Sequence, residues 1–286
     1  MKNQDPNQEH LQSIINFFTQ GQLRPALSEA TQMLERFPNS FVLYNIAGAC
    51  NAGLMQFDAA IISYKKAIKI KPDYALAHYN MGIALNHKGD LEAAIKSYKE
   101  AIKIKPDYPQ AHNNMGNTLK EKGDLDSAIS SYKKAIKIKP DYADPYNNIG
   151  IALNHKGDLE ASIESYKQAL KIKPDYPQAY NNMGNTLKEK GDLDAAISCF
   201  KKAIKIKPSY AEVHSNLGDA FQLLNQTEQA IVSYEKAISL KNDLDTAISG
   251  LGTALLKKGE HSKGLDKLRQ GDGSILFNIK SGLSIK

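Results

Sequence analysis

The chain has 286 residues, of which 42% are hydrophobic and 24% are charged, and its formal net charge is +6. This composition excludes a disordered chain, and no apolar run reaches the roughly twenty residues that a membrane-spanning helix needs. Residues 1–10 lack the features of a secretory signal, and Cys50 and Cys199 lie far apart without metal-site spacing. We therefore expect a cytoplasmic protein with free thiols and without a metal or other cofactor.

The dominant feature of the sequence is a period of 34 residues that several kinds of residue share. Such a period predicts an array of stacked repeats, in which each unit packs mainly on its neighbours. The prolines are Pro38, Pro72, Pro106, Pro140, Pro174 and Pro208; the glycines are Gly48, Gly82, Gly116, Gly150, Gly184, Gly218 and Gly252; the aromatic residues are Tyr64, Tyr98, Tyr132, Tyr166, Phe200 and Tyr234.

The period divides the chain into five segments. We expect a flexible N-terminus (1–6), a degenerate capping repeat (7–40), six clear repeats (41–244), a degenerate C-terminal repeat (245–270) and a tail (271–286). In the first capping repeat Ile14 stands where other repeats have glycine, and in the last repeat glycines replace the alanines. Divergent ends are typical of capping repeats, which present one face to water.

Each repeat is predicted to contain two helices. In residues 75–108, the apolar residues between Leu91 and Ile102 recur at steps of three and four, as on one face of a helix. Before this helix, Gly89 suits a left-handed helix end and Asp90 suits an N-cap. The sequence therefore predicts a helix on each side of Gly89.

The start of the first helix and its internal glycine lead to two further predictions. Asp107 with Gln110 fits a capping box, as do Asp175 with Gln178 and Ser209 with Glu212. Gly82 lies inside a predicted helix, where glycine costs roughly 1 kcal/mol relative to alanine. We expect close approach of the second helix at Ala94 to require this glycine.

Gly82, Ala94, Tyr98, Ala101 and Pro106, at this spacing, resemble the signature of the tetratricopeptide repeat family, and the resemblance covers about residues 41–244. It implies an all-α fold, namely a right-handed superhelical solenoid of about eight antiparallel helix pairs. It also implies that the first helices line a concave groove for a protein or peptide partner. Because the sequence contains no catalytic constellation, we expect no enzymatic activity.

A second period of 68 residues is superimposed on the first. Residues 109–142 and 177–210 differ at five positions, and residues 75–108 and 143–176 form a similar pair. This pattern indicates duplication of a two-repeat block. It makes the first helices alternate in surface residues: Ile83, Asn117, Ile151 and Asn185 at one position, and Asn86–His87, Lys120–Glu121, Asn154–His155 and Lys188–Glu189 at another.

The candidate binding site is a set of polar residues on the first helices, which the resemblance assigns to the concave wall. We call Asn80, Asn114, Asn148, Asn182 and Asn216 the first asparagine row, and Asn113, Asn147 and Asn181 the second asparagine row. Asn117, Asn185, Lys120 and Lys188 complete the predicted peptide-binding set.

A ladder of asparagines can bind a peptide main chain, because a carboxamide both donates and accepts hydrogen bonds. The arrangement is similar to the asparagine ladder in the tetratricopeptide arm of protein O-GlcNAc transferases. We therefore predict an adaptor that binds extended protein segments. The alternative for these residues is a structural role, in which the asparagines cap or bridge helices within the array.

Two other functions are compatible with the sequence. The chain could be the substrate-recognition arm of an enzyme such as a glycosyltransferase, with the catalytic domain outside this chain, or it could self-associate through exposed solenoid ends. Some family members grip a C-terminal carboxylate with lysine, asparagine and arginine, but the corresponding rows here carry asparagine, glutamine and aspartate. We therefore do not expect a receptor for chaperone tails.

Three lysine rows are predicted to face outward on the second helices. Acidic residues interleave with them and no arginine or aromatic platform accompanies them, so we interpret the rows as a solvated face and expect neither nucleic acid nor membrane as partner. The rows are Lys65, Lys99, Lys133, Lys167 and Lys201; Lys69, Lys103, Lys137, Lys171 and Lys205; and Lys71, Lys105, Lys139, Lys173 and Lys207.

Two remaining segments carry predictions of structure. His78, His112 and His214 recur in the first helices, and the roughly 10 Å between neighbouring helices is too far for shared metal ligation, so we expect them to pack in the core. In the tail, residues 274–279 and 282–285 alternate in polarity. This alternation predicts a short hairpin that caps the last repeat, the alternative being a linker.

Overall fold

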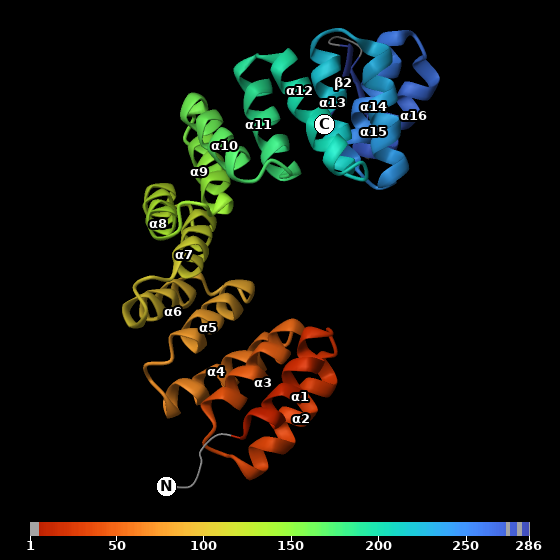
Figure 1. Ribbon diagram of the computed structural model, residues 1–286. Coiled ribbons are helices and arrows are strands. Elements are labelled where there is room, and N and C mark those ends of the chain that lie inside the picture. Colours follow the sequence, from red (N-terminus) through yellow and green to blue (C-terminus); the bar gives the residue numbers. More distant parts are fainter. Residues whose placement is uncertain (1–5, 273–274, 279–281, 286) are drawn as a thin grey trace. The chain divides into compact units, whose positions relative to one another are not determined.

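The computed structural model describes residues 6–272, 275–278 and 282–285, and it leaves out the side chains of residues 8–10 and of all residues after 271. Sixteen α-helices follow one another along the described part of the chain (Figure 1). They are α1 (Gln8–Thr19), α2 (Leu23–Arg36), α3 (Phe41–Gly53), α4 (Phe57–Ile70), α5 (Ala75–His87), α6 (Leu91–Ile104), α7 (Pro109–Glu121), α8 (Leu125–Ile138), α9 (Ala143–His155), α10 (Leu159–Ile172), α11 (Pro177–Lys190), α12 (Leu193–Ile206), α13 (Ala211–Leu223), α14 (Thr227–Leu240), α15 (Asp245–Lys258) and α16 (His261–Asp272).

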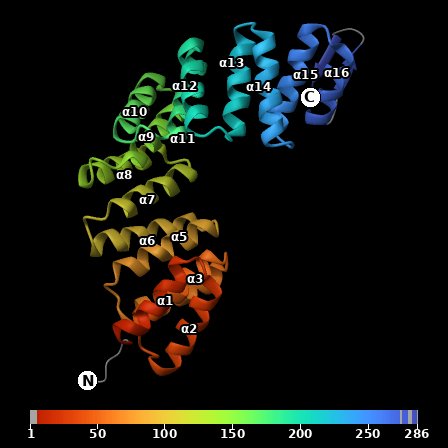
Figure 2. The same cartoon turned by 45° about the vertical axis from the view of Figure 1, so that its right-hand side comes forward.

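The helices pack in consecutive pairs, and the chain divides into two compact units. Odd-numbered helices pack on the helix that follows them, as α3 does on α4, α7 on α8 and α11 on α12. Figure 2 shows α13, α14, α15 and α16 side by side. The two units are Met1–Pro145 and Tyr146–Lys286. The predicted all-α arrangement of helix pairs is confirmed, and no described helix is long and apolar enough to cross a bilayer.

The turn between the helices of a pair is built as predicted. Gly89 has a φ of +84°, a conformation that glycine adopts without steric cost. Asp90 is the N-cap of α6, and its carboxylate accepts a hydrogen bond of 3.2 Å from the backbone N–H of Ala93. The same cap recurs at the N-termini of α8, α10 and α12, formed by Asp124, Asp158 and Asp192.

The prediction of capping boxes at the first helices is wrong. The N-cap of α7 is Tyr108, and that of α11 is Tyr176, and neither makes a side-chain capping hydrogen bond. Tyr210 holds the same position before α13. In α7 and α11 a proline occupies the first helical turn, but α13 begins at the same position with Ala211, so the later start does not depend on proline.

In the six clear repeats, the glycine inside the first helix is required by an aromatic ring rather than by the alanine that we expected. A Cβ added to Gly82 would lie 2.6 Å from Cε1 of Tyr98, and one added to Gly116 would lie 2.5 Å from Cε1 of Tyr132. Ala94 is fully buried beside them, but it is not what the added Cβ would meet. The aromatic row therefore packs directly against the backbone of the first helices.

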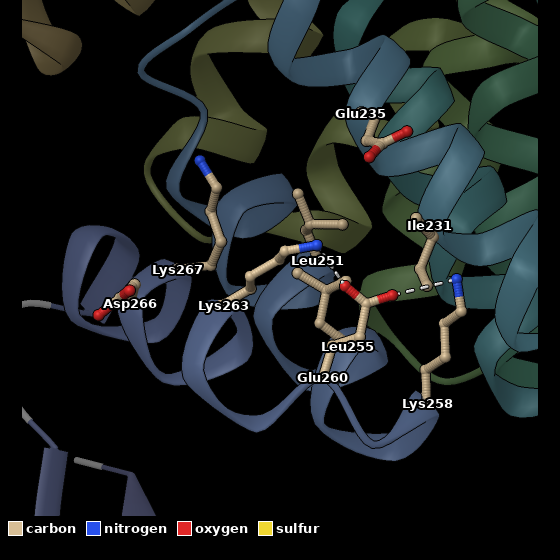
Figure 3. Close-up of a pocket in the computed structure, with 9 residues that line it drawn as sticks. All are labelled: Ile231, Glu235, Leu251, Leu255, Lys258, Glu260, Lys263, Asp266 and Lys267. Atoms are coloured by element: carbon tan, nitrogen blue, oxygen red, sulfur yellow. Dashed lines mark hydrogen bonds and ion pairs between the residues drawn. The ribbon is translucent and has the colours of Figure 1, made fainter.

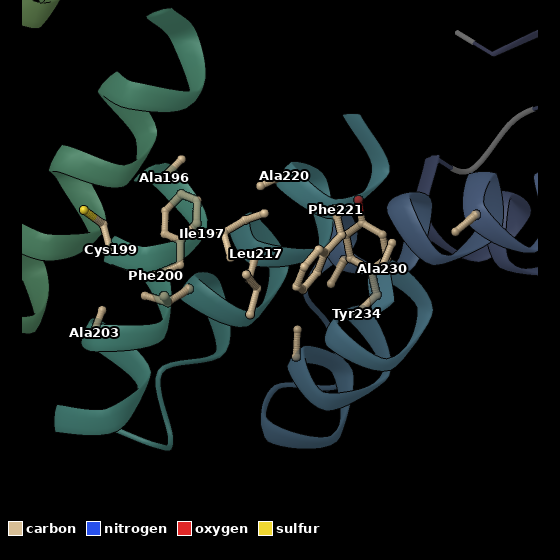
Figure 4. Close-up of a cluster of buried hydrophobic side chains, with 14 of the residues drawn as sticks. Ala196, Ile197, Cys199, Phe200, Ala203, Leu217, Ala220, Phe221, Ala230 and Tyr234 are labelled. Atoms are coloured by element: carbon tan, nitrogen blue, oxygen red, sulfur yellow. The ribbon is translucent and has the colours of Figure 1, made fainter. Parts of the chain in front are cut away.

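Each unit has its own hydrophobic core. In Figure 4, Phe200 on α12, Leu217 and Phe221 on α13 and Tyr234 on α14 converge in the core of the second unit. The first unit has an equivalent cluster around Tyr64 and Tyr98. Each ring of the aromatic row in these clusters packs on the glycine of the first helix of its own pair and belongs to the core of its unit, which gives the aromatic residue a packing role in every clear repeat.

Both cysteines lie in these interiors. Cys50 in the first unit and Cys199 in the second are free and buried, as predicted for the thiols. Burial raises the pKa of each thiol to about 11. The thiolate is the reactive form of cysteine, so neither residue is a good nucleophile at neutral pH.

The left-handed residue in the turn after the first helix is not always glycine. Met55 and Asn225 occupy this position with φ values of +61° and +59°. Asparagine tolerates the left-handed region, whereas for methionine it costs on the order of 1–2 kcal/mol. Met55 is also 76% exposed, so burial does not offset this strain.

The tail contains two short strands. β1 (Ile275–Asn278) and β2 (Gly282–Ile285) pair antiparallel, with Ile275 opposite Ile285. Residues 279–281, which would form the turn of the predicted hairpin, lie outside the described residues, as do the side chains of both strands. The predicted cap on the last repeat therefore stays a prediction.

Candidate functional site

The two asparagine rows lie on the first helices with different exposures. Asn80, Asn114, Asn182 and Asn216 of the first row are half-buried, as is Asn148. Asn113, Asn147 and Asn181 of the second row are buried, with exposed fractions of 5–9%. Only the first row is therefore partly open to solvent.

The first row is bonded to the preceding repeat. Nδ2 of Asn182 donates to Oδ1 of Asn147 at 3.1 Å, and Nδ2 of Asn216 donates to Oδ1 of Asn181 at 2.9 Å. In the first unit, Nδ2 of Asn80 donates to Oδ1 of Asn45 at 3.1 Å. Every one of these bonds joins residues 35 positions apart, that is, equivalent faces of consecutive repeats.

Asn114 has a different acceptor. Its Nδ2 donates at 2.9 Å to the hydroxyl of Tyr79, which holds the position of the second row in α5. Asn45 and Tyr79 therefore belong to the bridging set, although the sequence analysis missed them. They could have been found by counting back 35 residues from Asn80 and Asn114, the same offset that separates the second row from the next residue of the first row. These contacts agree with the structural alternative, in which the asparagines bridge helices within the array.

Asn117 and Asn185 differ in their surroundings, although both are half-buried. The hydroxyl of Tyr132 donates to Oδ1 of Asn117 at 2.9 Å. The residue equivalent to Tyr132 in the later repeat is Phe200, which has no hydroxyl to donate. The carboxamide of Asn117 is thus oriented by a bond that Phe200 cannot supply to Asn185.

The two predicted lysines also differ. Nζ of Lys188 lies 2.9 Å from Oδ2 of Asp219, and Oδ1 of Asp219 accepts a bond of 2.9 Å from the hydroxyl of Tyr234. Lys120 is half-buried and forms no ion pair in the described part of the chain. Desolvation lowers the pKa of Lys120, and the neighbouring Glu121 opposes this effect.

Asn86 and Asn154, which hold the position of Lys120 and Lys188 in the other kind of repeat, form hydrogen bonds that join neighbouring repeats. Nδ2 of Asn86 donates to Oε2 of Glu121 at 2.9 Å, and Nδ2 of Asn154 donates to Oε2 of Glu189 at 2.8 Å. The same pair thus occurs once in each 68-residue block. The alternation of the surface residues has a structural reason, because unlike repeats complement each other here.

Two of the three histidines, His112 and His214, are buried as predicted, whereas His78 is only half-buried. His78 and His214 contact the loops before the first helices. Nε2 of His78 lies 2.9 Å from the carbonyl oxygen of Pro72, and Nε2 of His214 lies 3.1 Å from that of Pro208. Because a carbonyl oxygen only accepts, Nε2 carries the proton in both. His112 is buried, and burial lowers its pKa. Among the described residues, no group of three or more histidines, cysteines or carboxylates could hold a metal ion.

The third lysine row has a contact that the sequence analysis missed. The ammonium groups of Lys105, Lys173 and Lys207 lie 4.5–4.8 Å from the ring centroids of Tyr108, Tyr176 and Tyr210. Lys71 and Lys139 lie in the same way over Tyr74 and Tyr142. A cation over an aromatic face is weakly stabilising at an exposed site. These lysines therefore hold the loops between repeats and are not purely a solvated face.

A pocket of about 450 Å³ lies in the last repeats, apart from the asparagine rows. Its apolar residues are Ile231, Leu251 and Leu255. Figure 3 shows Glu260 between Lys258 and Lys263, at 3.2 and 2.8 Å. The lining contains three lysines and three carboxylates, so its charges balance and favour no charged ligand.

Several solved structures have folds similar to that of this chain. The crystal structure of the APC/C hetero-tetramer Cut9-Hcn1 matches 92% of this chain with a TM-score of 0.65 and 18% identity, and the chain spans about half (52%) of that protein's length. The crystal structure of MamA matches 57% of this chain and 95% of its own, with a TM-score of 0.52 and 26% identity. YrrB, described as a TPR protein with an unusual peptide-binding site, matches 65% of this chain and 95% of its own (TM-score 0.51, 23% identity).

Sequence comparison gives the family. No curated protein matches the chain significantly. The family described as TPR repeat matches residues 56–89, 84–123, 116–156, 152–191 and 184–224, and that described as tetratricopeptide repeat matches residues 211–244. Since these matches run without a gap over more than half of the sequence, the chain belongs to the tetratricopeptide repeat family.

Proposed function

We propose that this chain is an adaptor that binds an extended segment of a partner protein along its first helices, through the first asparagine row. Tetratricopeptide repeats are scaffolds for protein–protein interaction, so a protein partner follows from the family. The use of the asparagine rows for a peptide main chain is the finer part of the proposal. The similarity of these rows to the asparagine ladder of O-GlcNAc transferases motivates this finer proposal.

The observation that carries the proposal is the bridge from the first row to the preceding repeat. A carboxamide has two N–H donors and an oxygen with two lone pairs. The bond from Asn182 to Asn147 uses one N–H of Asn182, which leaves the other N–H and the oxygen for a ligand. The bridge also fixes the side-chain rotamer before a ligand arrives, which lowers the entropy cost of binding.

The other predicted residues contribute to the proposed binding in different ways. The buried second row, Asn113, Asn147 and Asn181, supports the first row and is too enclosed to meet a ligand directly. Asn117 and Asn185 extend the polar surface by one helical turn. Lys188 is paired with Asp219 and adds little charge.

The alternative of a recognition arm for an enzyme gains no support from the family or from the similar structures. Self-association through the ends of the array is a separate alternative. It predicts that the mass measured by light scattering rises with protein concentration in the absence of any partner.

The proposal is tested by replacing Asn114, Asn148 and Asn182 with alanine together. Each lost hydrogen bond contributes roughly 1 kcal/mol, so binding of an arrayed set of unstructured peptides should weaken about a hundredfold. Circular dichroism should show the helices intact, with a lower Tm because buried acceptors such as Oδ1 of Asn147 lose their donor.

The matched control is Tyr79→Phe, which removes the acceptor of Asn114 but keeps every asparagine. This variant should lose about 1 kcal/mol of stability and weaken peptide binding far less than the triple variant does, because it removes one bridge and no carboxamide. If the folded triple variant binds the peptides as well as the unaltered chain does, the asparagines are only structural and the proposal is wrong.

A further inference from the structure

Lys120 presents a positive charge beside the asparagine rows. It lies on α7, three residues after Asn117 and therefore on the same face of the helix. It is half-buried, and among the described residues no carboxylate lies within ion-pair distance of its ammonium. The adjacent carboxylate, Glu121, accepts the bond from Asn86 across the joint between the repeats.

The duplicated block shows how the same lysine is neutralised elsewhere. Lys188 has the same sequence neighbours as Lys120, and its ammonium is paired at 2.9 Å with Asp219, which stands 31 residues later. The residue 31 positions after Lys120 is Ile151, which cannot accept a proton or a hydrogen bond from it. Partial burial of an ammonium without a counter-charge is unfavourable, so Lys120 gains from any carboxylate that a ligand supplies.

We propose that Lys120 binds an acidic side chain of the extended segment, so that the partner carries an aspartate or glutamate where it crosses α7. The inference rests on the proposed function, because it assumes that the segment lies along the asparagine rows. The carboxamides bind main chain and leave the side chains unread, whereas a half-buried ammonium distinguishes a carboxylate from a neutral or cationic group. Lys120 thereby sets both sequence preference and register.

The experiment uses the full chain and arrayed peptides that are identical apart from one position, which carries glutamate, glutamine or lysine. The unaltered chain should bind the glutamate peptides about tenfold more tightly than the glutamine ones, and the preference should shrink as salt is added. Lys120→Gln should bind both kinds equally. Lys122→Gln is the matched control, because it removes the same charge from an exposed lysine two residues away that is paired with Glu92.

A second variant tests the comparison between the blocks. Asp219→Asn removes the counter-charge of Lys188 and should strengthen the preference for glutamate severalfold. The inference is overturned if Lys120→Gln keeps the preference, if Lys122→Gln loses it, or if Asp219→Asn leaves it unchanged. Its failure is distinct from failure of the proposed function. If glutamine peptides bind and depend on the first asparagine row but glutamate ones bind no better, only the role of Lys120 is wrong. If no peptide binds the unaltered chain, both are wrong.

Discussion

The repeats 109–142 and 177–210 differ at five positions, yet their polar contacts differ more than this number suggests. Tyr132 and Phe200 are both completely buried, and each packs on the glycine of its own first helix. The hydroxyl of Tyr132 orients Asn117, a bond that Phe200 cannot make for Asn185. The ring therefore serves packing in both repeats, whereas the hydroxyl of Tyr132 adds a hydrogen bond that packing does not require.

The lysines at equivalent positions in these two repeats also differ in their contacts. Lys120 and Lys188 have identical sequence neighbours, but only Lys188 is paired, because the partner residue comes from the following repeat. The chemistry of a position in such an array is set by two repeats together. A repeat that is copied exactly can thus acquire a new property from its neighbour.

The largest expected effect concerns what the two repeats share. Gly116→Ala and Gly184→Ala should each destabilise the chain by about 2–3 kcal/mol, because the new Cβ would lie 2.5–2.6 Å from a buried ring. Gly123→Ala is the control for substitution alone, since open space surrounds its Cβ position and only its φ of +89° is strained. It should cost about 1 kcal/mol. Urea unfolding measures all three, and equal losses at Gly116 and Gly123 would contradict ring packing.

Alkaline pH should separate the two repeats. Burial raises the pKa of Tyr132, so the folded chain keeps a proton that the unfolded chain releases near pH 10. Stability is present below that pH and is lost above it, by about 1.4 kcal/mol per pH unit for this residue. Tyr132→Phe should remove this part of the loss, measured as a shallower fall of Tm between pH 10 and 11. Parallel curves for the two proteins would show that Tyr132 titrates normally.

The smallest effect concerns the hydroxyl at neutral pH. Tyr132→Phe should cost about 1 kcal/mol, because it removes the bond to Asn117 and leaves the ring in place. Phe200→Tyr is the reciprocal change and should cost less or stabilise, since Asn185 stands where Asn117 does. A larger loss for Phe200→Tyr than for Tyr132→Phe would show that the second core has no room for the hydroxyl. Chemical denaturation of both variants checks the pair.

The fold was predictable because the period is carried by residues that pack. The glycine, the aromatic residue and the alanines of each repeat all contact one another or the same core, so their spacing specifies the helix pair. Asp90 was recognisable as an N-cap because its function is local. The capping boxes failed at all three sites, with or without a proline in the first helical turn, because the tyrosine that follows each predicted cap is the N-cap.

The site was less predictable, because its contacts join residues about 30 to 35 positions apart. Asn114 looks the same in sequence whether its partner is an asparagine or Tyr79. The pairing of Lys188 with Asp219 cannot be predicted from the residues next to Lys188, because Asp219 lies in the following repeat. The cation–aromatic contacts of the loops, such as Lys105 with Tyr108, span only three residues and could have been predicted from that spacing.

The joint between Asn86 and Glu121, repeated by Asn154 and Glu189, has a consequence for how such a chain lengthens. A single extra repeat inserted into the array would place two repeats of one kind next to each other, so that the position of Asn86 would face that of His87, or the position of Lys120 would face that of Glu121. A copied block of two repeats recreates a junction whose sequence the chain already contains. Duplication in steps of 68 residues is therefore the change in length that adds only junctions already present in the chain, the bond from asparagine to glutamate among them.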